Sequence, residues 1–444
     1  MTIVLRDVEI PDFGLPVEQP AIPAATFVAR CRRAYANAAC TWLVVYADRE
    51  HAANMLFLSG FEPRFEEALL LVGNEGEGYA AVAVLPGLSV VLAQSLSLMA
   101  QDRTQRPDLA AVLRECGLKR GDRIGLAGWK YAEETEFSGV SSRFYAPSWL
   151  AGTLAAVAGG DDGVVDSTPV LMHPTTGLRA VVDADQIASY EWGASRASAA
   201  VWRILSGIRE GERELDAVTR MGYAGEPMSC HLMLASGGGS APVVGMRSPG
   251  ARRLRRGDGV SIALGYWGGL SARAGLLTDG EDAFLDTAKS YFAGLLAWYE
   301  AAEIGVPGGE IFAHVSETLA RGGLRPALNP GHLTGHDEWV HSPIRPGSPD
   351  RIASGMPFQV DIIPVPMAAG RCLNCEDGAA FADAALRAAL RARHPGVSAR
   401  IEARRRFVEE TLGVALHDSV LPLSATPLCL PPFWLAPGKL LAVG

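Results

Sequence analysis

The densest group of side chains that could move protons lies in one short segment. His336, Asp337, Glu338 and His341 fall within six positions, and His332 stands just before them. Histidine suits general acid or base chemistry because its unperturbed pKa lies near neutral pH. Each of these side chains could equally be solvated or make a structural hydrogen bond. The segment 332–341 is therefore a candidate proton-transfer loop, and the sequence does not single out the acting histidine.

Several other segments of the sequence are expected to form strands, and two of them carry acidic side chains. Asp361 lies in the apolar run GMPFQVDIIP, and Glu376 lies in the segment Asn-Cys-Glu-Asp. Earlier in the chain, Gly257-Asp258 marks a turn that is followed by a buried strand over residues 260–264. A second turn at Gly268-Gly269 leads into a returning strand over residues 270–277. The pattern predicts a two-stranded core in the middle of the chain.

This arrangement resembles the creatinase, prolidase and methionine aminopeptidase family, whose catalytic domain has the pita-bread fold. In that family a Gly-Asp turn leads into a strand with one metal-binding Asp, and a second Asp lies on the returning strand. Residues 331–341 resemble its Gly-His-x-x-Gly loop, and residues 355–364 resemble its Gly-Met strand, with Asp361 where Glu is usual. Further matches are Glu376-Asp377, Ser236-Gly237 and the N-terminal segments 42–46, 54–60 and 61–72.

The resemblance implies a metal pair held by two Asp, one His and two Glu, and this sequence departs from that set. The first Asp position is Ala263, and the second falls on Ala272 or Ala274, depending on the alignment of the turn. Two remaining carboxylates are too few to offset the repulsion between two cations. We therefore expect no metal pair and no cofactor, while a single ion on a His-Asp-Glu trio stays open. The other ligand positions are matched by His332 or His341, Asp361 and Glu376.

Creatinase acts without metal, and the resemblance implies a similar use of the residues that remain. Asp361 and Glu376 would hold a positively charged nitrogen group, and His332 or His341 would carry the proton. We therefore expect a metal-independent hydrolase that acts on a C–N bond of a small polar nitrogen-containing metabolite. Two alternatives stay open, a non-catalytic binding homologue and an atypical Xaa-Pro aminopeptidase-like metallopeptidase. The further substrate contacts expected in the same loop are His336 and Glu338.

A third departure concerns a histidine that contacts substrate in the family. Its position falls on Val243 or Val244 here. His231 could take its place from a neighbouring strand, or could be a core histidine bonded to backbone. Arg273 on the returning strand could favour an anionic group of the substrate, or could be a surface residue.

The resemblance also implies the domain organisation. We expect an α/β creatinase-like domain over residues 1–180 and an α+β pita-bread domain over residues 181–444. The first 25 residues are Pro-rich and predict an irregular surface arm, and residues 185–207 show the apolar stripe of a long helix. In dimers of this type the N-terminal domain of one subunit closes the pocket of the other. The contacts expected at this lip are Arg64, Glu66 and Glu67.

Composition excludes several other classes of protein. The 444 residues carry a net charge of −9, which argues against a nucleic-acid partner. Seven scattered cysteines predict free thiols and a cytoplasmic location. The uncharged stretch 79–100 is interrupted by Pro86-Gly87, so we expect two buried strands there instead of a membrane span.

Overall fold

The computed structural model describes residues 2–63, 67–74, 79–86, 108–133, 144–240, 243 and 245–444. The chain divides into two compact units. Residues 22–180 form the smaller unit, and residues 1–21 together with 181–444 form the larger unit.

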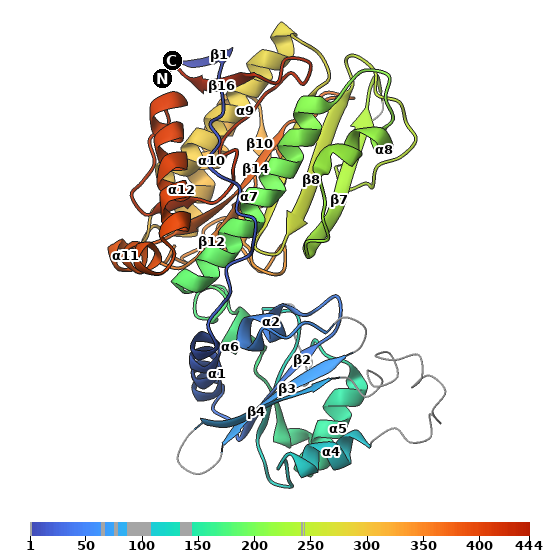
Figure 1. The fold of residues 1–444 in the computed structure, drawn as a ribbon, viewed down its shortest axis with the longest axis vertical. Helices are drawn as coiled ribbons and strands as arrows, with labels where there is room; N and C mark the ends of the chain where they lie inside the picture. The colour runs from blue at the N-terminus through green and yellow to red at the C-terminus, as the bar shows by residue number, and fades with distance from the viewer. Residues whose placement is uncertain are drawn as a thin grey trace. The chain divides into compact units, whose positions relative to one another are not determined.

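The smaller unit is built on one mixed sheet with the strand order β4-β3-β2-β5-β6 (Figure 1). β2 pairs antiparallel with β3 and parallel with β5, so a strand from each half of the unit flanks it. The buried side chains of β2 and β5 pack with those of α4 and α5 into one core. The elements are α1 (Ala24–Ala38), β2 (Trp42–Ala47), α2 (Ala53–Ser59), β3 (Ala68–Asn74), β4 (Tyr79–Pro86), α4 (Leu109–Glu115), β5 (Ile124–Ala127), α5 (Ser148–Ala158), β6 (Val164–Asp166) and α6 (Thr168–Met172).

The larger unit is built on a sheet with the strand order β11-β12-β14-β9-β8-β7, and β15 also pairs with β14. The central pairs are antiparallel. The strands are β7 (Met228–Gly237), β8 (Gly259–Tyr266), β9 (Gly269–Leu276), β11 (His332–Leu333), β12 (Pro357–Val360), β14 (Asn374–Phe381) and β15 (Val420–Pro422).

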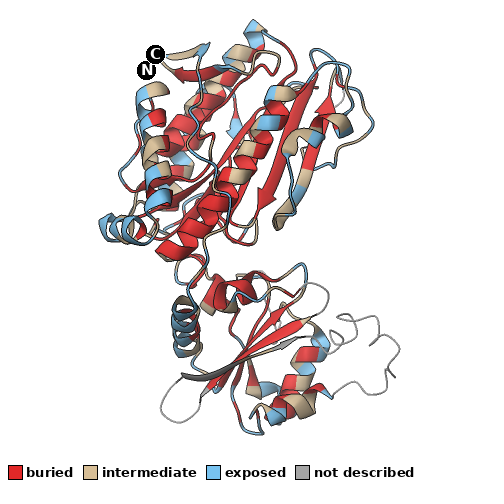
Figure 2. Cartoon of the chain, in the orientation of Figure 1, coloured by how far each residue is buried: buried red, intermediate tan, exposed pale blue. Residues whose placement is uncertain are grey.

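Helix α7 (Ala184–Gly207) packs along β8 and β9 and is buried over most of its length (Figure 2). Asp183 caps the N-terminus of α7, because its side chain accepts a hydrogen bond from the backbone N–H of Gln186. The β8–β9 turn approaches it closely, because a Cβ added to Gly269 would lie 2.6 Å from Ala194. The structure confirms the helix predicted over residues 185–207.

The remaining elements of the larger unit surround this sheet. Helices α9 and α10 pack against each other, and α11 and α12 follow the last long strand. These elements are α8 (Glu214–Ala217), α9 (Asp282–Ala301), α10 (Gly308–Arg321), β10 (Arg325–Pro326), β13 (Pro364–Val365), α11 (Ala384–Arg393), α12 (Pro395–Arg406), β1 (Ile3–Asp7) and β16 (Lys439–Val443).

The predicted N-terminal arm has no helix or strand over residues 8–23, as expected, but it begins with a strand and belongs to the larger unit instead of the domain predicted over residues 1–180. Residues 3–7 form β1, which pairs antiparallel with β16 at the other end of the chain. The first 21 residues consequently belong to the larger unit. The local sequence could not show this, because the strand that supplies the hydrogen bonds comes from the C-terminus.

The structure also bears on the predictions for the uncharged stretch 79–100 and for the cysteines. The first half of the stretch 79–100 forms β4, as expected, and residues 87–100 lie outside the described residues. No helix in the described part of the chain is long and apolar enough to cross a membrane. All seven cysteines are free thiols.

Candidate functional site

One row of side chains crosses four neighbouring strands of the larger unit. Ala263 of β8 lies opposite Ala272 of β9, and Ala272 lies opposite Glu376 of β14. Val360, the last residue of β12, pairs with Asp377 of the antiparallel strand β14. The next residue, Asp361, therefore lies opposite Glu376. Side chains alternate between the two faces of a sheet with period 2. The row therefore presents two methyl groups and two carboxyl groups on the same face.

The two carboxyl groups form a buried, interacting pair. Asp361 and Glu376 are each 7% exposed, and a hydrogen bond joins their side chains. Burial raises the pKa of Asp361 well above its usual value, and the charges of Glu376 and Glu338 raise it further. Burial also raises the pKa of Glu376, against a lowering effect of the hydrogen bond that the Asn374 amide donates. Both groups therefore retain a proton to higher pH than a free carboxyl group, Asp361 more strongly than Glu376.

His332 lies at the edge of this pair and is 2% exposed. Its Nε2 atom is 3.3 Å from Glu338 Oε1 and 3.9 Å from Asp361 Oδ2. Its Nδ1 atom is 3.1 Å from the backbone carbonyl of Leu333, which can only accept a hydrogen bond. Nδ1 must therefore carry a proton, so in the neutral ring Nε2 keeps its lone pair facing the carboxyl groups.

The other two histidines of the loop lie in different surroundings. The backbone of His341 pairs with Leu333, and its ring centroid is 6.1 Å from that of Trp339. His336 is 8% exposed and packs edge-on against Tyr190 and Trp267. The roles predicted for His341 and His336 stay predictions.

Several neighbours of the row had no predicted role. Met233, Leu270 and the two alanines of the row form a small apolar cluster, and the thiol of Cys230 packs against it. Burial raises the pKa of Cys230 to about 11, with further raising by the charges of Glu338 and Glu376. Asn374 could have been found from the sequence, because it stands two residues before Glu376 and thus shares its strand face. Cys230 could not, because its place depends on irregular pairing of β7 with β8.

The prediction that Arg273 contacts substrate was wrong. Arg273 pairs with Cys375 and therefore points to the face opposite Glu376. It is 1% exposed and makes a double contact with Asp377, at 2.9 and 3.0 Å. Its other guanidinium hydrogens go to the backbone carbonyls of Ala272, Glu376, Thr426 and Cys429. Arg273 is a structural residue of the sheet.

His231 lies on the edge strand β7, where it is exposed. Its Nε2 atom is 3.3 Å from the hydroxyl of Ser248. On the same strand Ser236, part of the Ser-Gly match, donates to Glu214 at 2.5 Å and accepts from Arg252 at 2.7 Å. The structure thus gives this serine structural partners, whereas the contact of His231 is with Ser248, and the substrate role predicted for His231 stays a prediction.

The residues predicted for the lip belong to the other unit. Arg64 and Glu66 lie outside the described residues. Glu67 is partly exposed, and its charge adds to the raised pKa of Tyr46, for which burial is the main cause. The homodimer in which this segment closes the partner's pocket stays a prediction.

The donor set does not fit a metal pair. The first Asp position of the family carries the methyl group of Ala263, and either alignment of the second gives an alanine on the same face, Ala272 beside Glu376 or Ala274 beside Asn374. Among the described residues, no group of three or more His, Cys, Asp or Glu side chains is arranged to hold a metal ion. Asp361 Oδ1 is a buried oxygen without a hydrogen-bond partner, so this side of the row keeps an unsatisfied polar atom.

Comparisons with known proteins agree with this geometry at the level of the fold. The sequence matches no protein-family model, and a search of curated proteins finds no significant match. The prolidase from Thermococcus sibiricus superimposes with a TM-score of 0.61 at 15% identity, over 82% of this chain and 95% of that one. The Xaa-Pro dipeptidase from Bacillus anthracis gives 0.59 at 15% identity, over 81% and 95%.

A third structure, the X-Pro aminopeptidase from Thermotoga maritima, gives a TM-score of 0.60 at 14% identity, over 80% of this chain and 94% of that one. Identities this low establish the fold and leave the chemistry open. The resemblance read from the sequence is confirmed, and the chain has the fold of the prolidase and Xaa-Pro peptidase structures.

Proposed function

We propose that this chain is a metal-independent hydrolase that cleaves a C–N bond in a small polar metabolite carrying a positively charged nitrogen. The observation that carries the proposal is the row of two methyl groups and two buried carboxyl groups across β8, β9, β14 and the end of β12. The prolidase-like fold supports a hydrolase, and the donor set argues against metal chemistry. A partly ionised carboxyl pair in a low-dielectric site attracts a cation strongly.

The carboxyl pair supplies both binding and a proton. The ionised member, Glu376, accepts hydrogen bonds from a cationic N–H group. Asp361, whose pKa is raised by burial and by the neighbouring Glu376 charge, keeps its proton and donates it to a developing basic atom. Two carboxyl groups with different pKa values can thus take different roles in one site.

His332 completes the proton path. Its Nε2 lone pair faces the carboxyl groups, so it takes a proton from a water molecule as the water oxygen forms a bond to the substrate carbon. The C–N bond breaks as the leaving nitrogen takes the proton of Asp361, and the proton on His332 then passes to the Asp361 carboxylate, which restores both groups. Glu338, 3.3 Å away, stabilises the imidazolium that forms in between.

The proposal is tested with purified full-length protein treated with a chelator and offered a panel of guanidino and amide metabolites. We expect metal-independent turnover of a panel member, and a loss of about 100-fold or more in Glu376→Gln and in His332→Gln. Glu409→Gln, a change on the surface of the larger unit, serves as the matched control and keeps full activity.

Each alternative gives a different result in the same experiments. Hydrolysis of Xaa-Pro peptides that depends on added manganese would establish an atypical metallopeptidase and end the proposal. A thermal shift with a panel member, without turnover by the unmodified protein, would establish a non-catalytic binding homologue. Unchanged turnover in Glu376→Gln would remove the carboxyl pair from the mechanism.

A further inference from the structure

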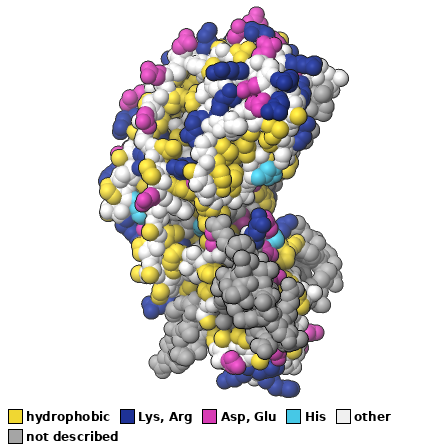
Figure 3. Space-filling view, turned by 45° about the vertical axis from the view of Figure 1, so that its right-hand side comes forward, with side chains coloured by type: hydrophobic (Ala, Val, Ile, Leu, Met, Phe, Trp, Pro, Cys, Tyr) yellow, Lys and Arg dark blue, Asp and Glu magenta, His cyan; other side chains and the backbone are white. Residues whose placement is uncertain are grey.

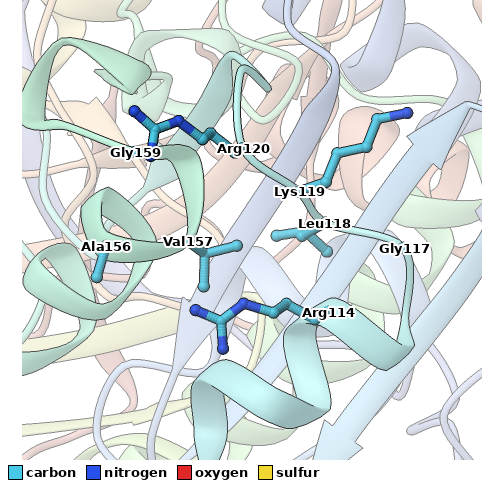
Figure 4. Close-up of a pocket in the computed structure, with 8 residues that line it drawn as sticks. All are labelled: Arg114, Gly117, Leu118, Lys119, Arg120, Ala156, Val157 and Gly159. Atoms are coloured by element: carbon cyan, nitrogen blue, oxygen red, sulfur yellow. The ribbon is translucent and has the colours of Figure 1, made fainter.

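A second polar site lies in the smaller unit, away from the carboxyl row. It is a cavity of about 500 Å³ between the last turn of α4, the turn that follows it and the end of α5 (Figure 4). Its floor consists of Leu118 and Val157, which are 1% and 2% exposed. The residues that line it are Arg114, Gly117, Leu118, Lys119, Arg120, Ala156, Val157 and Gly159.

The charged side chains around this cavity are all positive. Arg114 and Arg120 extend toward the α5 side, while Lys119 extends from the turn in another direction (Figure 4). Arginines with a carboxylate partner occur elsewhere in the chain, such as Arg196 with Glu226. Among the described residues, by contrast, none of the three cations at the cavity has an ion-pair partner.

Hydrogen bonds of the local backbone fix the turn that carries Lys119 and Arg120. The N–H of Gly121 donates to the carbonyl of Ala158, at 2.8 Å, which ties the turn to the end of α5. The carboxylate of Asp122 accepts from the backbone N–H of Lys119, at 2.7 Å, so this nearby acid is used within the turn. The stem of Arg120 lies over Gly159, where an added Cβ would be 2.9 Å from Arg120 Cγ.

Arg114, Lys119 and Arg120 are exposed at the rim of the cavity, so their charges are open to an anion from solution. Figure 3 shows basic side chains gathered at the lower end of the smaller unit, at the level of α4 and α5 in Figure 1. Like charges held close together repel one another, and a bound anion removes that cost. Guanidinium groups match the oxygens of a phosphate group through paired hydrogen bonds.

We propose that this cavity binds a small phosphorylated metabolite, with the phosphate groups on Arg114 and Arg120. The volume lies within the range of small-molecule sites, about 300–1,000 Å³. A nucleic acid would need a longer basic stripe along its backbone, which a cavity bordered by three cations does not supply. The inference does not depend on the function proposed for the carboxyl row.

The test is isothermal titration calorimetry of the full-length chain with inorganic pyrophosphate, at low and at physiological salt. We expect saturable binding that weakens as salt rises. In the double variant Arg114→Gln/Arg120→Gln, the affinity should fall by about tenfold or more, because two charge-assisted contacts are lost. Arg33→Gln, which changes an exposed arginine of α1 outside the cavity, is the matched control and should bind like the unmodified chain.

Arg114→Lys separates paired hydrogen bonding from charge alone, and its affinity should fall between those of the unmodified chain and the double variant. Thermal melting of each variant checks that it folds. Unsaturable binding up to about 1 mM pyrophosphate, equal binding by the double variant, or an equal loss in Arg33→Gln would each overturn the proposal.

Discussion

Replacing Asp361 with Asn should make the larger unit more stable while it abolishes turnover. Asp361 is buried beside Glu376, and its pKa is raised by burial and by that neighbour's charge. Unfolding lets the carboxyl group ionise at its ordinary pKa, so the native state loses stability as the pH rises from that value through the raised one. An amide of the same shape cannot ionise and does not incur this loss.

The expected gain follows from the environment of the side chain. A buried acid whose pKa is raised costs stability at alkaline pH, at a rate of about 1.4 kcal/mol for each pH unit between its unfolded and folded pKa values. Asp361→Asn should therefore raise the free energy of unfolding by about 1–3 kcal/mol at pH 8, and by close to nothing below pH ~4. In a unit of this size each kcal/mol corresponds to about 2–4 °C in Tm.

Scanning calorimetry of both proteins from acid to mildly alkaline pH measures this difference. Asp377→Asn is the matched control, because Asp377 lies in the same sheet, is 2% exposed and is bound by Arg273. Breaking that buried ion pair should destabilise the unit by about 3–5 kcal/mol. A lower Tm for Asp361→Asn at pH 8, or a gain independent of pH, would refute the account of the carboxyl pair.

Three further predictions follow from the same face of the sheet. If the proposed hydrolase activity is found, turnover by the unmodified protein should decline as the pH rises through the raised pKa of Asp361, because the donor then loses its proton; a pH–rate profile without an alkaline decline would contradict this. Ala263→Asp/Ala272→Asp should create the missing donors beside Glu376, so that calorimetry detects tighter manganese binding than in the unmodified chain; equal binding by both proteins would show that other donors suffice. Gly269→Ala should lower the Tm, because its Cβ would lie 2.6 Å from Ala194, and an unchanged Tm would mean that α7 can move away at little cost.

The candidate site was predictable where chemistry follows from residue type and local period. Asp361, Glu376 and His332 were expected to act together, and the structure brings them within one interacting group. The partners of Arg273 were not predictable, because its contact Asp377 lies 104 positions away. The face of the sheet to which a side chain points depends on the register of its strand, and a shift of one residue moves the side chain to the other face.

Local patterns were enough to predict the succession of strands, the long helix α7 and the alanines at two acidic positions of the family. These features are local, because periodicity and residue type need no knowledge of distant partners. Three other features became visible only in the folded chain: β1 pairs with β16, Arg273 turns away from Glu376, and two arginines line one cavity without an ion-pair partner among the described residues. Each of these depends on hydrogen-bond register or charge pairing between segments far apart in the chain, which no local pattern encodes.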